Sequence, residues 1–196
     1  MRATSATAAL LLASAMLALP ALAHTQQGQA AGLAAGLLHP VSGLDHVLAM
    51  VAVGLWGAQL GRPAIWLLPV TFPLVMALGG FLGLVGVPLP GVEIGIAASA
   101  LLLGALVATQ SRPPLWLAAA IVGVFAVFHG HAHGTELPPG HSGLLYSAGF
   151  VVATGCLHAA GVLIGLVHRW PAGRVALRLG GVGIALAGLY FLWRAW

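Results

Sequence analysis

The sequence predicts an all-α polytopic membrane protein, a six-transmembrane-helix bundle that follows a cleavable N-terminal signal peptide. Two observations lead to this prediction. Of the 196 residues, 60% are hydrophobic and only 5% are charged, whereas soluble domains contain about 25% charged residues. Apolar runs of about 20 residues also recur along most of the chain, and this is the length that crosses a bilayer as a helix.

The N-terminal segment Met1–Ala23 has the pattern of a secretory signal peptide. An arginine near the start precedes the apolar stretch Ala8–Leu19, and Ala21-Leu22-Ala23 offers small residues for cleavage. Cleavage there makes His24 the first residue of the mature chain, outside the cytoplasm. The alternative is an uncleaved first span. Residues 24–196 are expected to form a single six-helix transmembrane domain.

Six apolar runs follow, separated by short turns that contain proline and glycine. They are Gly43–Gly61, Ala64–Val87, Val92–Gln110, Leu115–Gly130, Ser142–Val167 and Val175–Trp193. A short apolar piece, Ala30–Leu38, precedes the first run, and His39-Pro40 is expected to interrupt the helix between them. Glycines at four-residue spacing predict close helix–helix contacts. The pairs are Gly79 and Gly83, Gly91 and Gly95, and Gly161 and Gly165.

All seven basic residues are arginines, which give a net charge of +4. They are scattered between apolar spans, so they form no patch for nucleic acid, and without lysine the chain has no P-loop. If the mature N-terminus is outside, Arg62, Arg112 and the group Arg169/Arg174/Arg178 lie at cytoplasmic connections. The external turns Pro88–Gly91 and Gly134–His141 contain no arginine. This positive-inside pattern predicts that both termini are extracytoplasmic.

The segment Phe128–Glu136, FHGHAHGTE, concentrates ionisable residues at the end of an apolar run. In a continuing helix, His129, His133 and Glu136 share one face and His131 points away. Two imidazoles and a carboxylate suit a borderline divalent cation such as nickel, cobalt, zinc or copper. The alternative is a solvated loop, because Gly130 and Gly134 can unwind the helix end.

A second cluster, HPVSGLDH, spans His39 to His46 at the start of the first run. Its proline and glycine predict irregular backbone, which is tolerated at membrane depth only inside protein or beside a water-filled cavity. Asp45 and His46 are candidate ligands with His39, and Asp45 is alternatively a helix N-cap. Met50, one turn beyond His46, is assigned to the core rather than to the site.

Two further ionisable residues lie in apolar runs. Glu93 shares a face with small residues and is expected to face a neighbouring helix rather than lipid. His158 lies deep in the fifth run. It is either a helix–helix hydrogen-bond donor or the next metal ligand inward from the outer clusters. Phe72, between two prolines, is assigned to packing near the same region. Whether His24, His131 and His141 bind metal stays open.

These motifs resemble the HupE/UreJ family of bacterial membrane proteins. The likeness is carried by HPVSGLDHVLAM, FHGHAHGTE and AGFVVATGCLHAAG, and it covers nearly the whole mature chain. The resemblance implies a nickel (sometimes cobalt) permease of the bacterial inner membrane, associated with hydrogenase or urease maturation. The positions that match are His39, Asp45, His46, Glu93, His133 and Glu136.

We therefore expect a transition-metal permease, not an enzyme, that is not driven by ATP and has no tightly bound cofactor. Its partners are a divalent cation, the lipid bilayer and metalloenzyme maturation proteins. Two alternatives remain: a haem-binding electron carrier using paired histidines, and a non-transporting accessory protein of metallocentre assembly. A hydrolase using Ser42 or Ser142 is disfavoured, because no G-x-S-x-G motif is present.

Overall fold

The computed structural model describes residues 32–137, 140 and 142–196, and every regular element in these ranges is helical. Met1–Ala23, His24 and His141 lie outside the described residues. The elements are a helix at Gly32–Ser42, then α2 (Leu44–Leu60), α3 (Ala64–Leu84), α4 (Val92–Thr109), α5 (Leu115–Thr135), α6 (Gly143–Gly165), the 3₁₀ turn η1 (Leu166–Arg169) and α7 (Pro171–Arg194). The predicted all-α fold is confirmed.

Five helices are long and apolar enough to cross a membrane: α3, α4, α5, α6 together with η1, and α7. A sixth span arises if Gly32–Ser42 and α2 are one broken span, bent by 81°. The exposed side chains of the bundle are largely aliphatic and aromatic, as expected for surfaces that face lipid. The prediction of a polytopic membrane bundle is confirmed.

The break in the first span lies at Gly43, not at His39-Pro40 as the sequence suggested. The first helix continues through Pro40 to Ser42, since a proline removes only one hydrogen bond from the helical ladder. Gly43 is then extended, with φ −105° and ψ 119°. The Ser42 hydroxyl donates to the His39 carbonyl at 2.6 Å, which satisfies one acceptor at the helix end.

Helix α5 runs five residues beyond the predicted end at Gly130 and reaches Thr135. Gly130 and Gly134 do not unwind it, because both lie against the backbone of α3. A Cβ atom at Gly130 would collide with the Met76 carbonyl, and one at Gly134 with the Gly80 carbonyl. These glycines therefore allow close helix packing and leave the helix intact.

The bundle is built from three close helix pairs: α3 with α5, α2 with α6, and α4 with α7. Gly79 and Gly83 face the α5 backbone, and Gly161 faces that of α2, which confirms two of the three predicted glycine pairs. The third pair is confirmed only for Gly95, which lies against α5, and is wrong for Gly91. Gly91 is the N-cap of α4 in the left-handed region (φ +70°), and Gly95 faces the ring of Phe128.

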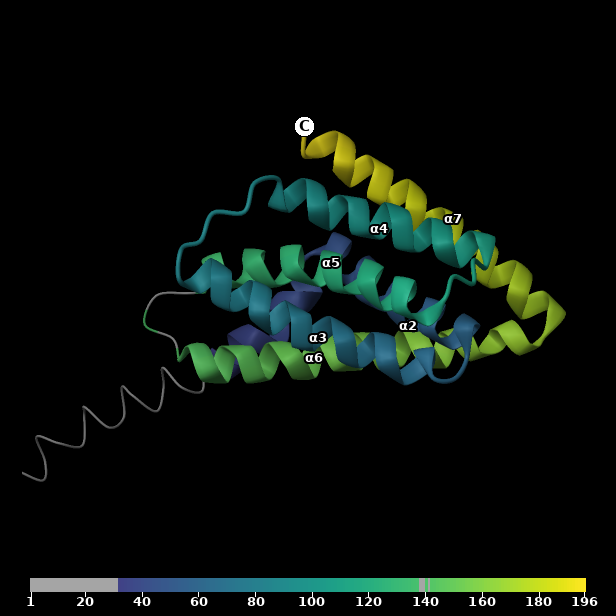
Figure 1. The fold of residues 1–196 in the computed structure, drawn as a ribbon, viewed down its shortest axis with the longest axis horizontal. Coiled ribbons are helices and arrows are strands. Elements are labelled where there is room, and N and C mark those ends of the chain that lie inside the picture. Colours follow the sequence, from purple (N-terminus) through teal and green to yellow (C-terminus); the bar gives the residue numbers. More distant parts are fainter. Residues whose placement is uncertain (1–31, 138–139, 141) are drawn as a thin grey trace, which may run out of the picture.

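The helices α2 to α6 run in alternating directions, so the acidic residues gather at one end of the bundle and most of the described arginines at the other, with Arg194 at the far end of α7 as the exception (Figure 1). The end where Gly32–Ser42 and α5 finish and α2 and α4 begin is called the histidine end. The opposite end, with the α2–α3 and α4–α5 connections and η1, is called the arginine end, since it carries Arg62, Arg112 and Arg169.

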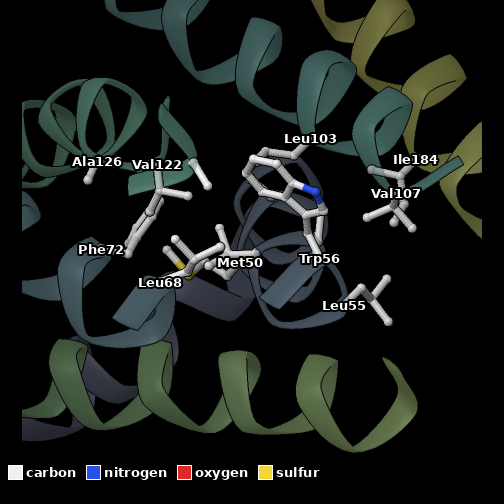
Figure 2. Close-up of a cluster of buried hydrophobic side chains, with 14 of the residues drawn as sticks. Met50, Leu55, Trp56, Leu68, Phe72, Leu103, Val107, Val122, Ala126 and Ile184 are labelled. Atoms are coloured by element: carbon white, nitrogen blue, oxygen red, sulfur yellow. The ribbon is translucent and has the colours of Figure 1, made fainter. Parts of the chain in front are cut away.

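Between the histidine end and the arginine end lies an apolar core (Figure 2). Phe72, Leu68, Trp56, Leu103 and Val107 are fully buried in it. Two of its polar groups donate to backbone carbonyls: the Trp56 indole N–H to Ser111 at 2.9 Å, and the Gln59 amide N–H to Val107 at 3.2 Å. This apolar core is filled by side chains.

We expect Gly130→Ala to destabilise the bundle, because its new methyl group must push α3 away through a backbone atom. The cost of such overpacking is about 1–3 kcal/mol. Thermal denaturation of the purified protein in detergent should show a lower midpoint. The matched control is Gly155→Ala on α6, where no atom lies within 4 Å of the added methyl group. Equal midpoints for the two variants would contradict the packing assignment.

Candidate metal centre

A polar cavity of about 430 Å³ opens at the histidine end. Its lining residues are His39, Ser42, Gly43, Asp45, His46, Glu93, Ala132, His133 and Glu136. The chain has three acidic residues in total, and all three are among them. Six of the eight predicted site residues thus meet at one cavity, and the two others, His129 and His158, lie deeper in the bundle.

Four helix ends meet at this cavity. The Gly32–Ser42 helix and α5 end here, and their free carbonyls contribute partial negative charge. Helices α2 and α4 begin here and contribute partial positive charge. Each of these two helices carries a carboxylate in its first turn, Asp45 in α2 and Glu93 in α4. The carboxylates offset the positive helix ends, so the cavity attracts cations.

The outermost group consists of His39, His133 and Glu136. Nε2 of His39 lies 3.0 Å from Oε2 of Glu136, and Nδ1 of His133 lies 3.8 Å from the same oxygen. One ligand atom from each of the three residues falls within 4.8 Å of the others. Nitrogen and oxygen ligands of a tetrahedral ion, at about 2.0–2.2 Å from the metal, are roughly 3.4 Å apart. A small contraction would close these groups around a cation.

Asp45 orients the next imidazole, that of His46. The Nδ1–H of His46 donates to Oδ1 of Asp45 at 2.9 Å, and the same oxygen accepts the backbone N–H of His46 at 2.8 Å. Nε2 of His46 is buried and has no hydrogen-bond partner within the described residues. A carboxylate on one nitrogen and a free lone pair on the other is the arrangement of histidines that bind metals.

Ser99 does the same for His129, which is fully buried. The Ser99 hydroxyl donates to the Ile96 carbonyl at 2.6 Å, so it accepts from the Nε2–H of His129 at 2.9 Å. Nδ1 of His129 keeps its lone pair and has no partner among the described residues. Sequence analysis did not find Ser99, since serine in an apolar helix is common and its partner lies 30 residues away.

Four imidazoles form a row that leads from the cavity into the bundle. The ring centroids of His39 and His133 are 4.7 Å apart, those of His133 and His46 are 4.8 Å apart, and those of His46 and His129 are 4.7 Å apart. The ring of Phe72 follows, 5.4 Å from His129 and 5.2 Å from His158. His158 is therefore separated from the other histidines by an aromatic ring.

Helix α6 supplies an aromatic wall that sequence analysis also missed. Phe150 lies 4.1 Å from the His133 ring, and Tyr146 lies 5.8 Å from the His39 ring. The signal was present as an unbroken four-residue periodicity along α6, from Tyr146 through Phe150 and Thr154 to His158. All four side chains are buried on the face toward the histidines.

Other candidates have structural roles. His131 points away from the row, as its spacing predicts, and its Nε2–H donates to the Val87 carbonyl at 2.7 Å. Met50 belongs to the apolar core. Ser42 donates to the His39 carbonyl and Ser142 accepts from the Leu145 amide, so both hydroxyls serve helix ends.

A helical membrane bundle with imidazoles and carboxylates gathered at one end defines the class: a polytopic membrane protein with a candidate cation site. The family model described as "HupE / UreJ protein" matches residues 10–191. "Protein HupE" of Rhizobium leguminosarum bv. viciae is 49% identical over 179 residues, which cover 91% of this chain and 94% of that protein. The chain belongs to the HupE/UreJ family. No solved structure matches it significantly.

We expect Asp45→Asn to weaken nickel binding by about 10–100-fold, because His46 loses the carboxylate that fixes its tautomer. The amide keeps the size of the side chain, so the fold is retained. Isothermal titration of the purified protein with Ni²⁺ measures the affinity. The control is His168→Ala at the arginine end, whose imidazole contacts the Gly165 carbonyl. An unchanged affinity in Asp45→Asn would refute the orienting role.

Proposed function

We propose that this protein is a nickel permease, which takes up Ni²⁺ across the bacterial cytoplasmic membrane without hydrolysing ATP. The observation that carries the proposal is the row of four imidazoles that begins at an acidic cavity and continues into the bundle. A site that only held a structural ion would need no such continuation.

The donor atoms favour a borderline divalent cation. Imidazole nitrogen and carboxylate oxygen accept nickel, cobalt, zinc and copper alike. Membership of the HupE/UreJ family supports the choice of nickel among these, and it suggests a link to hydrogenase or urease maturation. The cation is the substrate, and no tightly bound cofactor is invoked.

Capture begins at Glu136, whose side chain is half exposed, and passes to His39 and His133. Nε2 of His39 binds the cation in the neutral tautomer that carries the proton on Nδ1, so the metal bond replaces the contact of Nε2 with Glu136. His46 and His129 then offer lone pairs that Asp45 and Ser99 have oriented. Several overlapping ligand sets allow the ion to be handed on, because no single set holds it strongly.

The membrane potential is sufficient to drive entry if the histidine end faces outward. A divalent cation that crosses −100 mV gains about 4.6 kcal/mol, twice the value for one charge. The arginines at the opposite end fit this orientation by the positive-inside rule. The apolar core must open transiently for the ion to leave, since the side chains of Trp56, Leu68 and Leu103 fill it (Figure 2).

The haem alternative fits the geometry poorly. Axial imidazoles on opposite faces of a porphyrin hold the iron between them, each at about 2 Å from its nitrogen, which keeps the two ring centroids roughly 6 Å apart. The rings of His46 and His129 are 4.7 Å apart and meet edge to face. A porphyrin cannot lie between them.

We expect His133→Ala and Asp45→Ala to abolish nickel accumulation in cells, since each removes a group at the entrance of the row. Uptake of radioactive nickel, normalised to the amount of protein in the membrane fraction, tests this. His168→Ala should accumulate nickel normally. Normal uptake by both cavity variants would exclude the permease. Binding of nickel without any uptake by the unaltered protein would favour the non-transporting accessory role.

We expect the histidine end to be extracytoplasmic. In a Cys156→Ala background, a cysteine at Leu137 should react with a membrane-impermeant maleimide in intact cells. A cysteine at Ser111, in the α4–α5 connection, should react only after the membrane is permeabilised. The reverse labelling pattern would invert the topology and remove the electrical driving force.

A further inference from the structure

A second group of polar atoms lies beyond Phe72, on α6. The imidazole of His158 is 1% exposed and the side chain of Thr154 is fully buried. They are one helical turn apart on the same face. Within the described residues, neither ring nitrogen of His158 nor the Thr154 hydroxyl has a hydrogen-bond partner. Buried polar groups are rarely left unpaired, so three unpaired atoms in one place point to a ligand.

Helix α3 contributes a third polar group, the carbonyl of Pro69. In a regular helix this oxygen would accept the N–H four residues later, but that residue is Pro73, which has none. The Pro69 carbonyl lies beside the His158 imidazole and can accept a hydrogen bond from it. Two prolines at four-residue spacing thus place a backbone oxygen that lacks its usual helical donor beside the polar side chains of α6.

The ring of Phe72 separates these atoms from the outer row. It contacts His129 on one side and His158 on the other, with centroid distances of 5.4 and 5.2 Å. All three acidic residues of the chain line the outer cavity, so the group beyond Phe72 has only neutral donors. The two groups therefore differ in charge as well as in depth.

We propose that His158, the Thr154 hydroxyl and the Pro69 carbonyl form a second, inner binding site for the transported divalent cation. This inference rests on the proposed permease function and extends its path. One imidazole and two neutral oxygens suit the same borderline cations as the outer site. Without a carboxylate the inner site binds the ion more weakly, and this favours its onward release.

The competing explanation is structural: His158 donates to the Pro69 carbonyl and ties α6 to α3. Two conservative variants separate the explanations. Thr154→Val replaces the hydroxyl by a methyl group of the same shape and leaves His158 and Pro69 in place. Pro73→Ala restores the N–H that pairs with the Pro69 carbonyl, which withdraws this oxygen from the site. Neither change should matter for metal if His158 is only a helix tie.

The experiment titrates the full chain in lipid nanodiscs with each metal. Binding of Co²⁺ is monitored by its visible absorption, and binding of Ni²⁺ is measured by calorimetry. We expect two ions per chain, with the second bound at least tenfold more weakly. His158→Ala should lose the weakly bound ion and keep the tightly bound one. Thr154→Val and Pro73→Ala should each lower the affinity for the weakly bound ion by at least threefold. His133→Ala should affect the stronger ion, and His168→Ala neither.

Binding of one ion by the unaltered protein, or retention of both ions with unchanged affinities in His158→Ala and Thr154→Val, would overturn the inner site. If His158→Ala does not fold, Thr154→Val and Pro73→Ala decide the question. Nickel uptake by cells is measured in parallel. Two-ion binding without uptake would refute the permease and keep the inner site, whereas uptake with one-ion binding would refute the inner site alone.

Discussion

The close contact between the α3 and α5 backbones determines where the candidate metal ligands lie. Gly130 and Gly134 rest on the carbonyls of Met76 and Gly80, so α5 stays helical to Thr135 through a segment that contains two glycines. Because the helix continues, His129 and His133 remain on one face and point at His46 rather than into solvent. A loop in place of this last turn would scatter them.

The same contact explains why the histidines of α5 have different partners. His131, two residues from either neighbour, is turned away and donates to the Val87 carbonyl between α3 and α4. One helix thus carries two imidazoles toward the row of histidines and one toward the end of α3. The first two keep lone pairs free, and the third secures the end of the bundle that surrounds the cavity.

Much of the architecture could be predicted from the sequence, since it depends on local properties. Apolar run length and Pro–Gly turns located the spans to within a few residues, and residue spacing placed His133 beside Glu136. The break at Gly43 and the extension of α5 could not be predicted, because both depend on what lies against a glycine in the folded bundle. Pairs such as Ser99 with His129 join distant helices, and no pattern within one helix reveals them.

The distribution of charge has a physical reason in the bilayer. A carboxylate is costly in hydrocarbon but acceptable near the interface, where water reaches the cavity. Asp45, Glu93 and Glu136 all lie at helix ends, two of them where the helix dipole also favours a negative charge. The side chains that continue inward are imidazoles, which carry no negative charge.

The 81° bend at Gly43 has a consequence for the shape of the cavity mouth. His39 lies on one arm of the broken span and His46 on the other, so the separation of their imidazoles is controlled by the two backbone dihedrals of a single residue. A change in the φ and ψ angles of Gly43 would alter the width of the cavity mouth without unwinding either helix. The distance between the two imidazoles is thereby tied to the residue type with the fewest steric restrictions on its backbone.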